Sequence, residues 1–264
     1  MLKIENVWKT FNKGTVNEKV ALNCLNLHMQ PGDFVTVIGG NGAGKSTMLN
    51  AVAGVFGVDS GKIIIDGVDV THLPEYKRAQ YIGRVFQDPM MGTAATMQIE
   101  ENLALAARRG MPRTLKVGIT NAEREEYKEK LKILDLGLEN RMTAKVGLLS
   151  GGQRQALTLL MATLQKPKLL LLDEHTAALD PKTAAKVLEA TQKIVEKDNL
   201  TTLMITHNMR DAIAYGNRLV MMYNGHIVVD VSGEEKKKLT VEQLLNLFSQ
   251  ASGSDEVSDK MVLG

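Results

Sequence analysis

Residues 39–47 form a glycine-rich stretch that ends in a lysine and two hydroxyl side chains. It follows an apolar run, Phe34 to Ile38, and precedes an expected helix over Thr47 to Val52. Glycines leave backbone N–H groups free for phosphate, the lysine can reach β- and γ-phosphates, and the serine hydroxyl can bind magnesium. The spacing is that of a phosphate-binding loop, made of Gly39, Gly40, Asn41, Gly42, Ala43, Gly44, Lys45, Ser46 and Thr47. The loop alone is compatible with a kinase, a GTPase or another ATPase.

Two adjacent carboxylates follow the most apolar segment of the chain. The run Leu169 to Leu172 is typical of a central parallel strand, and it ends in Asp173 and Glu174. Because ligands of open parallel sheets bind beyond the carboxyl ends of the strands, we expect this pair beside the phosphate-binding loop. We expect Asp173 to orient magnesium through water and Glu174 to polarise the attacking water.

Two more apolar strands end in a polar side chain. Tyr81 to Phe86 is followed by Gln87, and Thr202 to Thr206 is followed by His207. A glutamine can contact the metal and the attacking water without carrying charge, and an imidazole can donate a hydrogen bond to the γ-phosphate. Either residue alone would be ordinary loop chemistry, but together they favour a catalytic edge formed by Gln87, Glu174 and His207.

A second anion-binding feature opens a helix that is expected to run to about Leu164. Ser150 is a favourable N-cap, and Gly151 and Gly152, followed by Gln153, leave the first N–H groups of the helix accessible to an anion. The phosphate-binding loop already cradles the phosphates of its own nucleotide. We therefore infer that this helix end covers the ATP bound to another copy, which predicts a head-to-tail homodimer closed by two nucleotides.

The surrounding pattern predicts an α/β fold. Short β-rich runs in the first quarter are separated by turns: Leu2 to Val7, Val20 to Leu27, Asp33 to Ile38 and Lys62 to Ile65. Helical patterns follow from Ile99, and strands then alternate with helices, which indicates a parallel, doubly wound sheet. We expect a P-loop NTPase core with a parallel sheet, an N-terminal antiparallel β subdomain and a helical subdomain that carries Ser150.

The expected boundaries describe one domain over residues 1–250, with a core of 1–87 and 166–250, a helical part of about 88–165, and a mobile tail over 251–264. Lys and Arg total 32 against 30 Asp and Glu, so the charge balance gives no reason to expect nucleic acid as a partner. We expect the basic cluster Lys236 to Lys238 to be solvated and the single cysteine, Cys24, to be buried in a strand.

The longest apolar run is far shorter than the roughly 18 residues of a membrane span, and the first residues do not resemble a secretory signal. A soluble protein is expected, whose role at a membrane would come through a partner.

The residues Leu149 to Gln153 match the signature motif of ABC ATPases letter for letter, and the order of the other motifs from Met1 to about Asp230 matches as well. The chain therefore resembles the ATP-binding subunit of ABC transporters, of the bacterial solute-importer type. The resemblance implies that Phe11 stacks on adenine, although Phe11 could instead be a core aromatic. It also implies that Asp180 contacts the opposite subunit. Arg154 extends the signature helix and is assigned no role beyond solvation.

For the whole protein the resemblance implies an ATPase that uses ATP and Mg²⁺ to drive solute import through separate integral membrane permease subunits. It suggests amino acids or similar small solutes as the substrate. It would lie in the cytoplasm on the inner face of the membrane, and a solute-binding receptor would be a further partner. The surface after Gln87 contains Met90 and Met91, which either receive a helix of the permease or fill the gap between the lobes.

The chain departs from the family pattern at His175, where most importer ATPases carry proline. Because a proline would fix the backbone φ angle, we expect a more pliable turn here. The alternative function is that of a soluble ABC ATPase in a cytosolic assembly, such as iron–sulfur cluster biogenesis. Its catalytic residues would be the same.

Overall fold

The computed structural model describes residues 1–111 and 118–252. Its larger sheet has six strands in the order β10-β9-β3-β8-β7-β6. All neighbours pair in parallel except β10, which is antiparallel to β9. This confirms the predicted parallel sheet. Its strands are β3 (Phe34–Gly39), β6 (Ile82–Val85), β7 (Leu169–Asp173), β8 (Thr201–Ile205), β9 (Arg218–Tyr223) and β10 (His226–Ser232).

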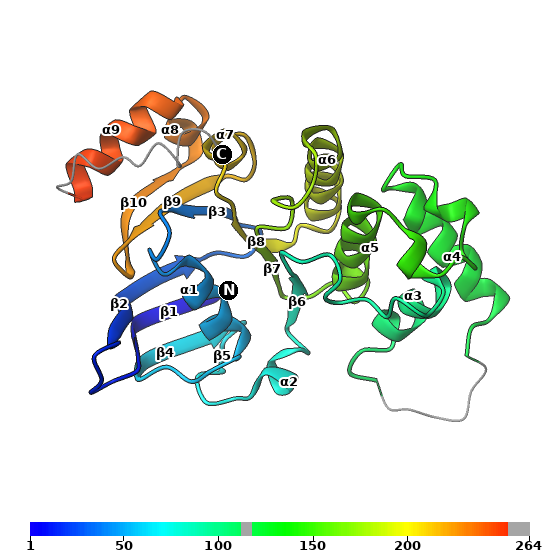
Figure 1. Cartoon of the computed structure of the whole chain (residues 1–264), viewed down its shortest axis with the longest axis horizontal. Helices are drawn as coiled ribbons and strands as arrows, with labels where there is room; N and C mark the ends of the chain where they lie inside the picture. The colour runs from blue at the N-terminus through cyan, green and yellow to red at the C-terminus, as the bar shows by residue number, and fades with distance from the viewer. Residues whose placement is uncertain (112–117, 253–264) are drawn as a thin grey trace.

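The second sheet is antiparallel, in the order β2-β1-β4-β5, and forms the predicted N-terminal β subdomain. Figure 1 shows it in blue and cyan at one end of the molecule. Its strands are β1 (Leu2–Phe11), β2 (Lys19–Met29), β4 (Ser60–Ile65) and β5 (Val68–Asp69).

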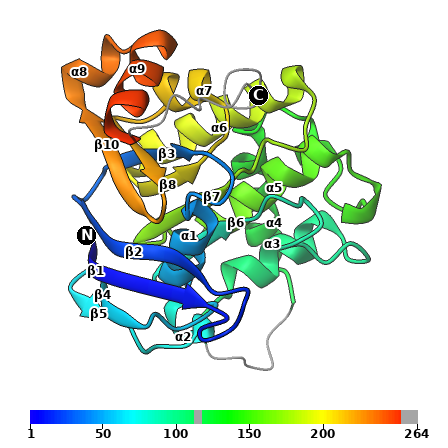
Figure 2. The same cartoon turned by 60° about the vertical axis from the view of Figure 1, so that its left-hand side comes forward.

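Nine α-helices connect and cover the strands over the described residues. They are α1 (Lys45–Ala53), α2 (Glu75–Arg78), α3 (Ile99–Ala107), α4 (Asn121–Lys132), α5 (Gly151–Thr163), α6 (Pro181–Asp198), α7 (Met209–Ala214), α8 (Gly233–Lys237) and α9 (Val241–Ser252). Two 3₁₀ turns, Leu138–Asn140 and Val146–Leu148, lie between α4 and α5. Helices α3, α4 and α5 gather at the end of the molecule opposite the antiparallel sheet (Figures 1 and 2).

The side chains of β7 divide the core into two layers, because successive residues of a strand point to opposite faces. Leu169 and Leu171 pack in one cluster with α1 and the antiparallel sheet. Leu170 and Leu172 pack in another cluster with α3, α5 and α6. All four leucines are fully buried, each worth about 1.5–3 kcal/mol. Helix α1 therefore lies between the two sheets, and α5 and α6 cover the other face of the parallel sheet.

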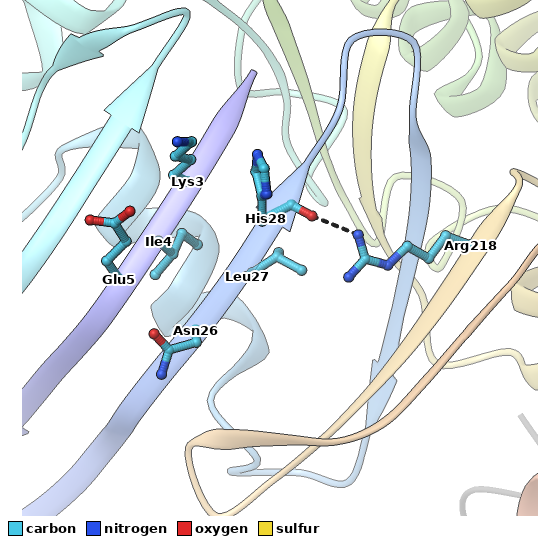
Figure 3. Close-up of a pocket in the computed structure, with 7 residues that line it drawn as sticks. All are labelled: Lys3, Ile4, Glu5, Asn26, Leu27, His28 and Arg218. Carbon is cyan, nitrogen blue, oxygen red and sulfur yellow. Dashed lines mark hydrogen bonds between the residues drawn. The ribbon is translucent and has the colours of Figure 1, made fainter.

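Arg218 of β9 joins the two sheets. Its Nη1 donates to the backbone oxygen of His28 in β2 at 2.6 Å, as Figure 3 shows. Two more N–H groups bind both carboxylate oxygens of Asp230 at 2.7 and 2.6 Å. This bidentate pair fixes the orientation of the guanidinium plane. Arg218 can therefore connect β2 to β9.

Two expectations about burial are corrected. Cys24 is exposed, since its left-handed φ of 48° lies at an irregularity of the β1–β2 pairing that turns the side chain outward. Lys236 is buried, with 2 % exposed, and donates to the oxygens of Ile213, Tyr215 and Gly216 at the end of α7.

The predicted mobile tail, 251–264, lies outside the described residues except for its first two residues, which continue α9. No helix in the described part of the chain is both long and apolar enough to cross a bilayer.

Candidate functional site

The phosphate-binding loop connects β3 to α1 at the carboxyl edge of the parallel sheet. Gly44, the N-cap of α1, has φ 103°, and a Cβ there would lie 2.6 Å from the oxygen of Ala21, so only glycine fits. The first turn of α1 carries no acidic side chain, which leaves its positive end suited to an anion.

Lys45 folds back over this loop. Its Nζ donates to the backbone oxygens of Gly39 at 2.7 Å and Gly40 at 3.3 Å, and the residue is 7 % exposed. Burial lowers the pKa of Lys45, and attraction to Glu174 and Asp173 opposes that shift. The ammonium group thus lies within electrostatic reach of both carboxylates at the end of β7.

Four adjacent strands deliver the other predicted groups to the same edge. In the order β3, β8, β7, β6 they are followed by the loop, His207, the Asp173–Glu174 pair and Gln87. Asp173 is in register with Ile205, and His207 Nδ1 lies 3.7 Å from Glu174 Oε2. A carboxylate and an imidazole are therefore neighbours here, and these are the side chains most suited to moving a proton.

Glu174 has an unusual backbone conformation. Its φ of 43° is left-handed, which costs a non-glycine residue about 1–3 kcal/mol. Its N–H donates to the oxygen of Ile205 in β8 at 3.0 Å. Strain of this kind persists only where the surroundings fix it, and it is common at functional sites.

Arg84 of β6 is a site residue that sequence reasoning missed. Its Nη2 lies 3.5 Å from Asp173 Oδ2 and donates to Asn50 Oδ1 at 2.6 Å. Burial raises the pKa of Asp173, whereas the attraction of Arg84 lowers it. The available signal was an arginine inside an apolar strand, three residues before Gln87. Arg84, Gln87 and Asp173 all line a cleft of about 700 Å³.

Phe11 lies close to the phosphate-binding loop. It is in register with Lys19, whose Nζ is 3.1 Å from the position of a Cβ at Gly42. The ring of Phe11 packs edge-to-face on Phe56 with centroids 5.2 Å apart, and the Nζ of Lys9 lies 5.3 Å from both rings. A partly exposed aromatic beside the loop is suited to stacking on a base.

The N-terminus of α5 is capped as the sequence predicted. Ser150 Oγ accepts from the N–H of Gln153 at 3.3 Å, and Gln153 Oε1 accepts from the N–H of Ser150 at 3.2 Å, forming a capping box. Gly152 packs tightly against Thr183 in the first turn of α6, whereas Gly151 has an ordinary contact with Leu179.

The N-terminus of α5 is separate from the loop. Helix α5 covers the face of the parallel sheet opposite to α1, and its start lies beside the start of α6. Asp180 caps α6 there, since its Oδ1 accepts from the N–H of Thr183 at 3.1 Å. The structure therefore brings Lys45, Glu174 and His207 together, and it leaves the signature residues 150–153 outside that group.

Helix α5 is nevertheless tied to the segment around Gln87. Gln155 Nε2 donates to the oxygen of Phe86 at 2.8 Å, and Arg154 contacts Met90 Sδ and donates to the oxygen of Val146 at 3.0 Å. Arg154 is 4 % exposed, which corrects the expectation that it is solvated.

Among the described residues, no three His, Cys, Asp or Glu side chains converge as a ready-made metal site. The candidate ligands for magnesium are the oxygens of Ser46, Gln87 and Asp173, which are the hard donors that this ion prefers when phosphate supplies further ligands.

Comparison with known proteins places this geometry in context. Residues 22–177 match the family model described as ABC transporter. The chain is 45 % identical, over 95 % of its length and all of the relative's, to a tyrosine transport ATP-binding protein of Clostridioides difficile. It is 32 % identical, over 99 % of its length and 73 % of the relative's, to a methionine import ATP-binding protein of Streptococcus pneumoniae. A dimeric ATP-binding cassette, solved in a post-hydrolysis state with ADP and phosphate, superposes with a TM-score of 0.75 at 30 % identity, over 88 % of this chain and 98 % of the other.

Proposed function

This chain belongs to the ABC transporter family, and we propose that it powers the import of a small amino-acid-like solute through a separate membrane permease. As a member of this family it is an ATPase. Lys45, Glu174 and His207 meet at one edge of the sheet, whereas the capped N-terminus of α5 belongs to a helix on the face opposite to α1, and this arrangement supports the proposal.

ATP would bind with its phosphates on the loop and the N-terminus of α1. Lys45 would exchange the carbonyl oxygens of Gly39 and Gly40 for the β- and γ-phosphates, which are stronger acceptors. Phe11 would stack on adenine, supported by its position beside the loop. Magnesium, held by Ser46, Gln87 and Asp173, would offset the negative charge of the phosphates.

Glu174 would accept the proton of the attacking water. His207, 3.7 Å from that carboxylate, would donate a hydrogen bond to the γ-phosphate, and Gln87 would orient the water from the neighbouring strand. Lys45 contributes positive charge at the same point, where negative charge develops on the phosphate oxygens.

Two copies would share their nucleotides head to tail. A single chain cannot present both anion-binding ends to one ATP, because α1 and α5 lie on opposite faces of the sheet. The Ser150 capping box and the N–H groups of Gly151 and Gly152 would therefore cover the γ-phosphate bound to the partner. Asp180 would contact the partner from the same surface.

The permease would dock beside Gln87. Met90 and Met91 are 58 % and 52 % exposed, and the adjacent cleft of about 700 Å³ is lined by Val55, Phe86 and Pro89 among others. Flexible methionine side chains around an apolar cleft suit a short amphipathic helix. Because Arg154 and Gln155 bind this segment, closure of the signature helix would move the docking surface.

The solute and direction are proposed from the relatives, whose names specify tyrosine transport and methionine import. The chain would work on the cytoplasmic face of the membrane, with a solute-binding receptor on the other side. Residues that contact the solute would lie on those partners.

The proposal can be tested by purifying the tagged chain from detergent-solubilised cells and reconstituting the membrane protein that accompanies it in liposomes. With ATP on the side of this chain, we expect saturable uptake of labelled tyrosine or a related amino acid, and no uptake with Lys45→Ala. If the tagged chain is recovered in a purely soluble complex, the cytosolic assembly function is favoured instead.

A further inference from the structure

His175, which directly follows Glu174, is buried between the end of β7 and helix α6. Only 2 % of the residue is exposed. The expectation of a pliable turn, based on the absence of proline here, gave this side chain no role. A polar ring removed from water requires a hydrogen-bond partner. The partner therefore shows which element the ring connects to the end of β7.

The partner is Thr191 of α6. His175 Nε2 lies 3.2 Å from Thr191 Oγ1, and that hydroxyl donates its own proton to the oxygen of Val187 at 2.8 Å. Because the hydroxyl proton is already used, the threonine oxygen acts as the acceptor and His175 Nε2–H as the donor.

Helix α6 is a firm anchor for this bond. It has 18 residues, and Val187, Leu188 and Ile194 on its inner face pack in the same core cluster as Leu170 and Leu172 of β7. Thr191 itself is 1 % exposed. The imidazole thus ties the end of β7 to a helix that the core already holds in place.

The residue fixed by this tie is Glu174, whose φ of 43° is left-handed. The N–H of Glu174 binds the oxygen of Ile205 at 3.0 Å, and its own oxygen accepts from the N–H of Ala177 at 2.9 Å. Relaxing Glu174 to a negative φ would rotate the peptide that leads into residue 175. That rotation would pull the imidazole away from Thr191.

We propose that His175 is a positioning residue, which holds Glu174 in its left-handed conformation through the hydrogen bond to Thr191. The inference rests on the role of Glu174 proposed above. In this proposal the hydrogen bond of His175 restrains the turn that follows β7. A proline at this position could provide no side-chain donor for such a bond.

The test uses two pairs of variants of the full chain. His175→Phe keeps a buried ring without the donor, and His175→Gln restores an N–H near the position of Nε2. Thr191→Val removes the acceptor at nearly equal volume, and Thr191→Ser keeps the hydroxyl. We expect His175→Phe and Thr191→Val to lower kcat for ATP about 10- to 100-fold with KM and ATP affinity changed less than about threefold. His175→Gln and Thr191→Ser should recover most of the rate.

The second readout is a double-mutant cycle with Glu174→Gln. If the bond acts through the carboxylate, Thr191→Val in the Glu174→Gln background should change the residual rate less than about twofold. A general structural defect would instead lower both rates alike. Thr191→Val and Thr191→Ser decide the matter if His175→Phe does not fold, because both leave the imidazole in place.

The positioning role would be overturned if Thr191→Val kept the wild-type kcat. It would also be overturned if Thr191→Val lowered the ATPase rate equally with Glu174 and with Gln at position 174, or lowered ATP affinity as much as kcat. Normal turnover by Glu174→Gln alone would instead remove Glu174 from the proposed mechanism. The two failures are therefore distinguishable.

Discussion

A Cβ atom on Gly152 would lie 1.9 Å from Cγ2 of Thr183, far inside the distance at which two carbon atoms can pack. The N-terminus of the signature helix α5 therefore rests directly on the first turn of α6. Glycine is required here for helix packing, independently of the phosphate contact proposed for its backbone. Its neighbour Gly151 has more room, since a Cβ there would be 3.5 Å from Leu179 Cδ2.

Gly152→Ala should lower the free energy of unfolding by about 1–3 kcal/mol, because α5 and α6 must move apart. Urea unfolding of the purified chain measures this loss. Thr183→Ser, which removes the clashing methyl group, should restore most of it in the double variant. Gly151→Ala is the matched control, with an expected change within about 0.5 kcal/mol. Equal losses at both glycines would contradict the packing argument.

Lys45→Ala should weaken ATP binding by at least about 100-fold, because a charge-assisted contact to two phosphates is lost. Displacement of a fluorescent nucleotide measures the affinity. Lys62→Ala, an exposed lysine of β4, serves as the control and should bind ATP like the unaltered chain. Unchanged affinity in Lys45→Ala would remove residues 39–47 as the nucleotide site.

The sequence predicted the strands and polar strand ends well because these features are local. Four strands end at one edge whatever the details of packing, so Lys45, Glu174 and His207 could be brought together on topology alone. The N-cap of α5 at Ser150 could also be predicted, because a capping box involves residues only three positions apart.

The features that the sequence did not predict depend on contacts between residues that are distant in the chain. Arg84, Arg154 and Lys236 look like surface cations in the sequence, yet each is largely buried against groups supplied by other elements. The prediction that Cys24 is buried was wrong because an irregularity in the β1–β2 pairing locally inverts the alternation of inward and outward side chains. Strand β10 and helix α9 were not predicted, although Leu244 and Phe248 of α9 complete a third core cluster.

Stability should depend on pH through His175. Burial lowers its pKa from 6.5 to about 4, so the unfolded chain takes up a proton between these values that the folded chain does not. Stability is therefore greatest above about pH 6.5 and falls as the pH drops towards 4. At pH 5 the loss relative to pH 7 should be about 2 kcal/mol from this group.

Urea unfolding at both pH values, repeated on His175→Phe, isolates the contribution of His175. The phenylalanine variant should lack that part of the pH dependence while keeping the part due to other groups. Identical pH dependence in the two proteins would show that His175 takes up its proton as readily in the folded chain as in the unfolded chain, and would contradict the prediction.

Lys236→Met should lower the free energy of unfolding by about 1–3 kcal/mol, since three backbone oxygens at the end of α7 lose their shared donor. Helix α7 begins two residues after His207, so a fall in kcat for ATP is expected too. Thermal unfolding and turnover are measured beside Lys237→Met, an exposed neighbour that pairs with Glu234. If the two variants are equally stable, Lys236 does not hold α7.

We propose that each ATP is held between the loop of one subunit and the Ser150 helix end of the other. The most direct measurement is the mass in solution of Glu174→Gln at saturating Mg-ATP, by sedimentation or light scattering. We predict a dimer with ATP, and a monomer without nucleotide or when Lys45→Ala is added. A Glu174→Gln chain that binds Mg-ATP tightly and stays monomeric, alone and with its permease, would show that two subunits do not share their nucleotides.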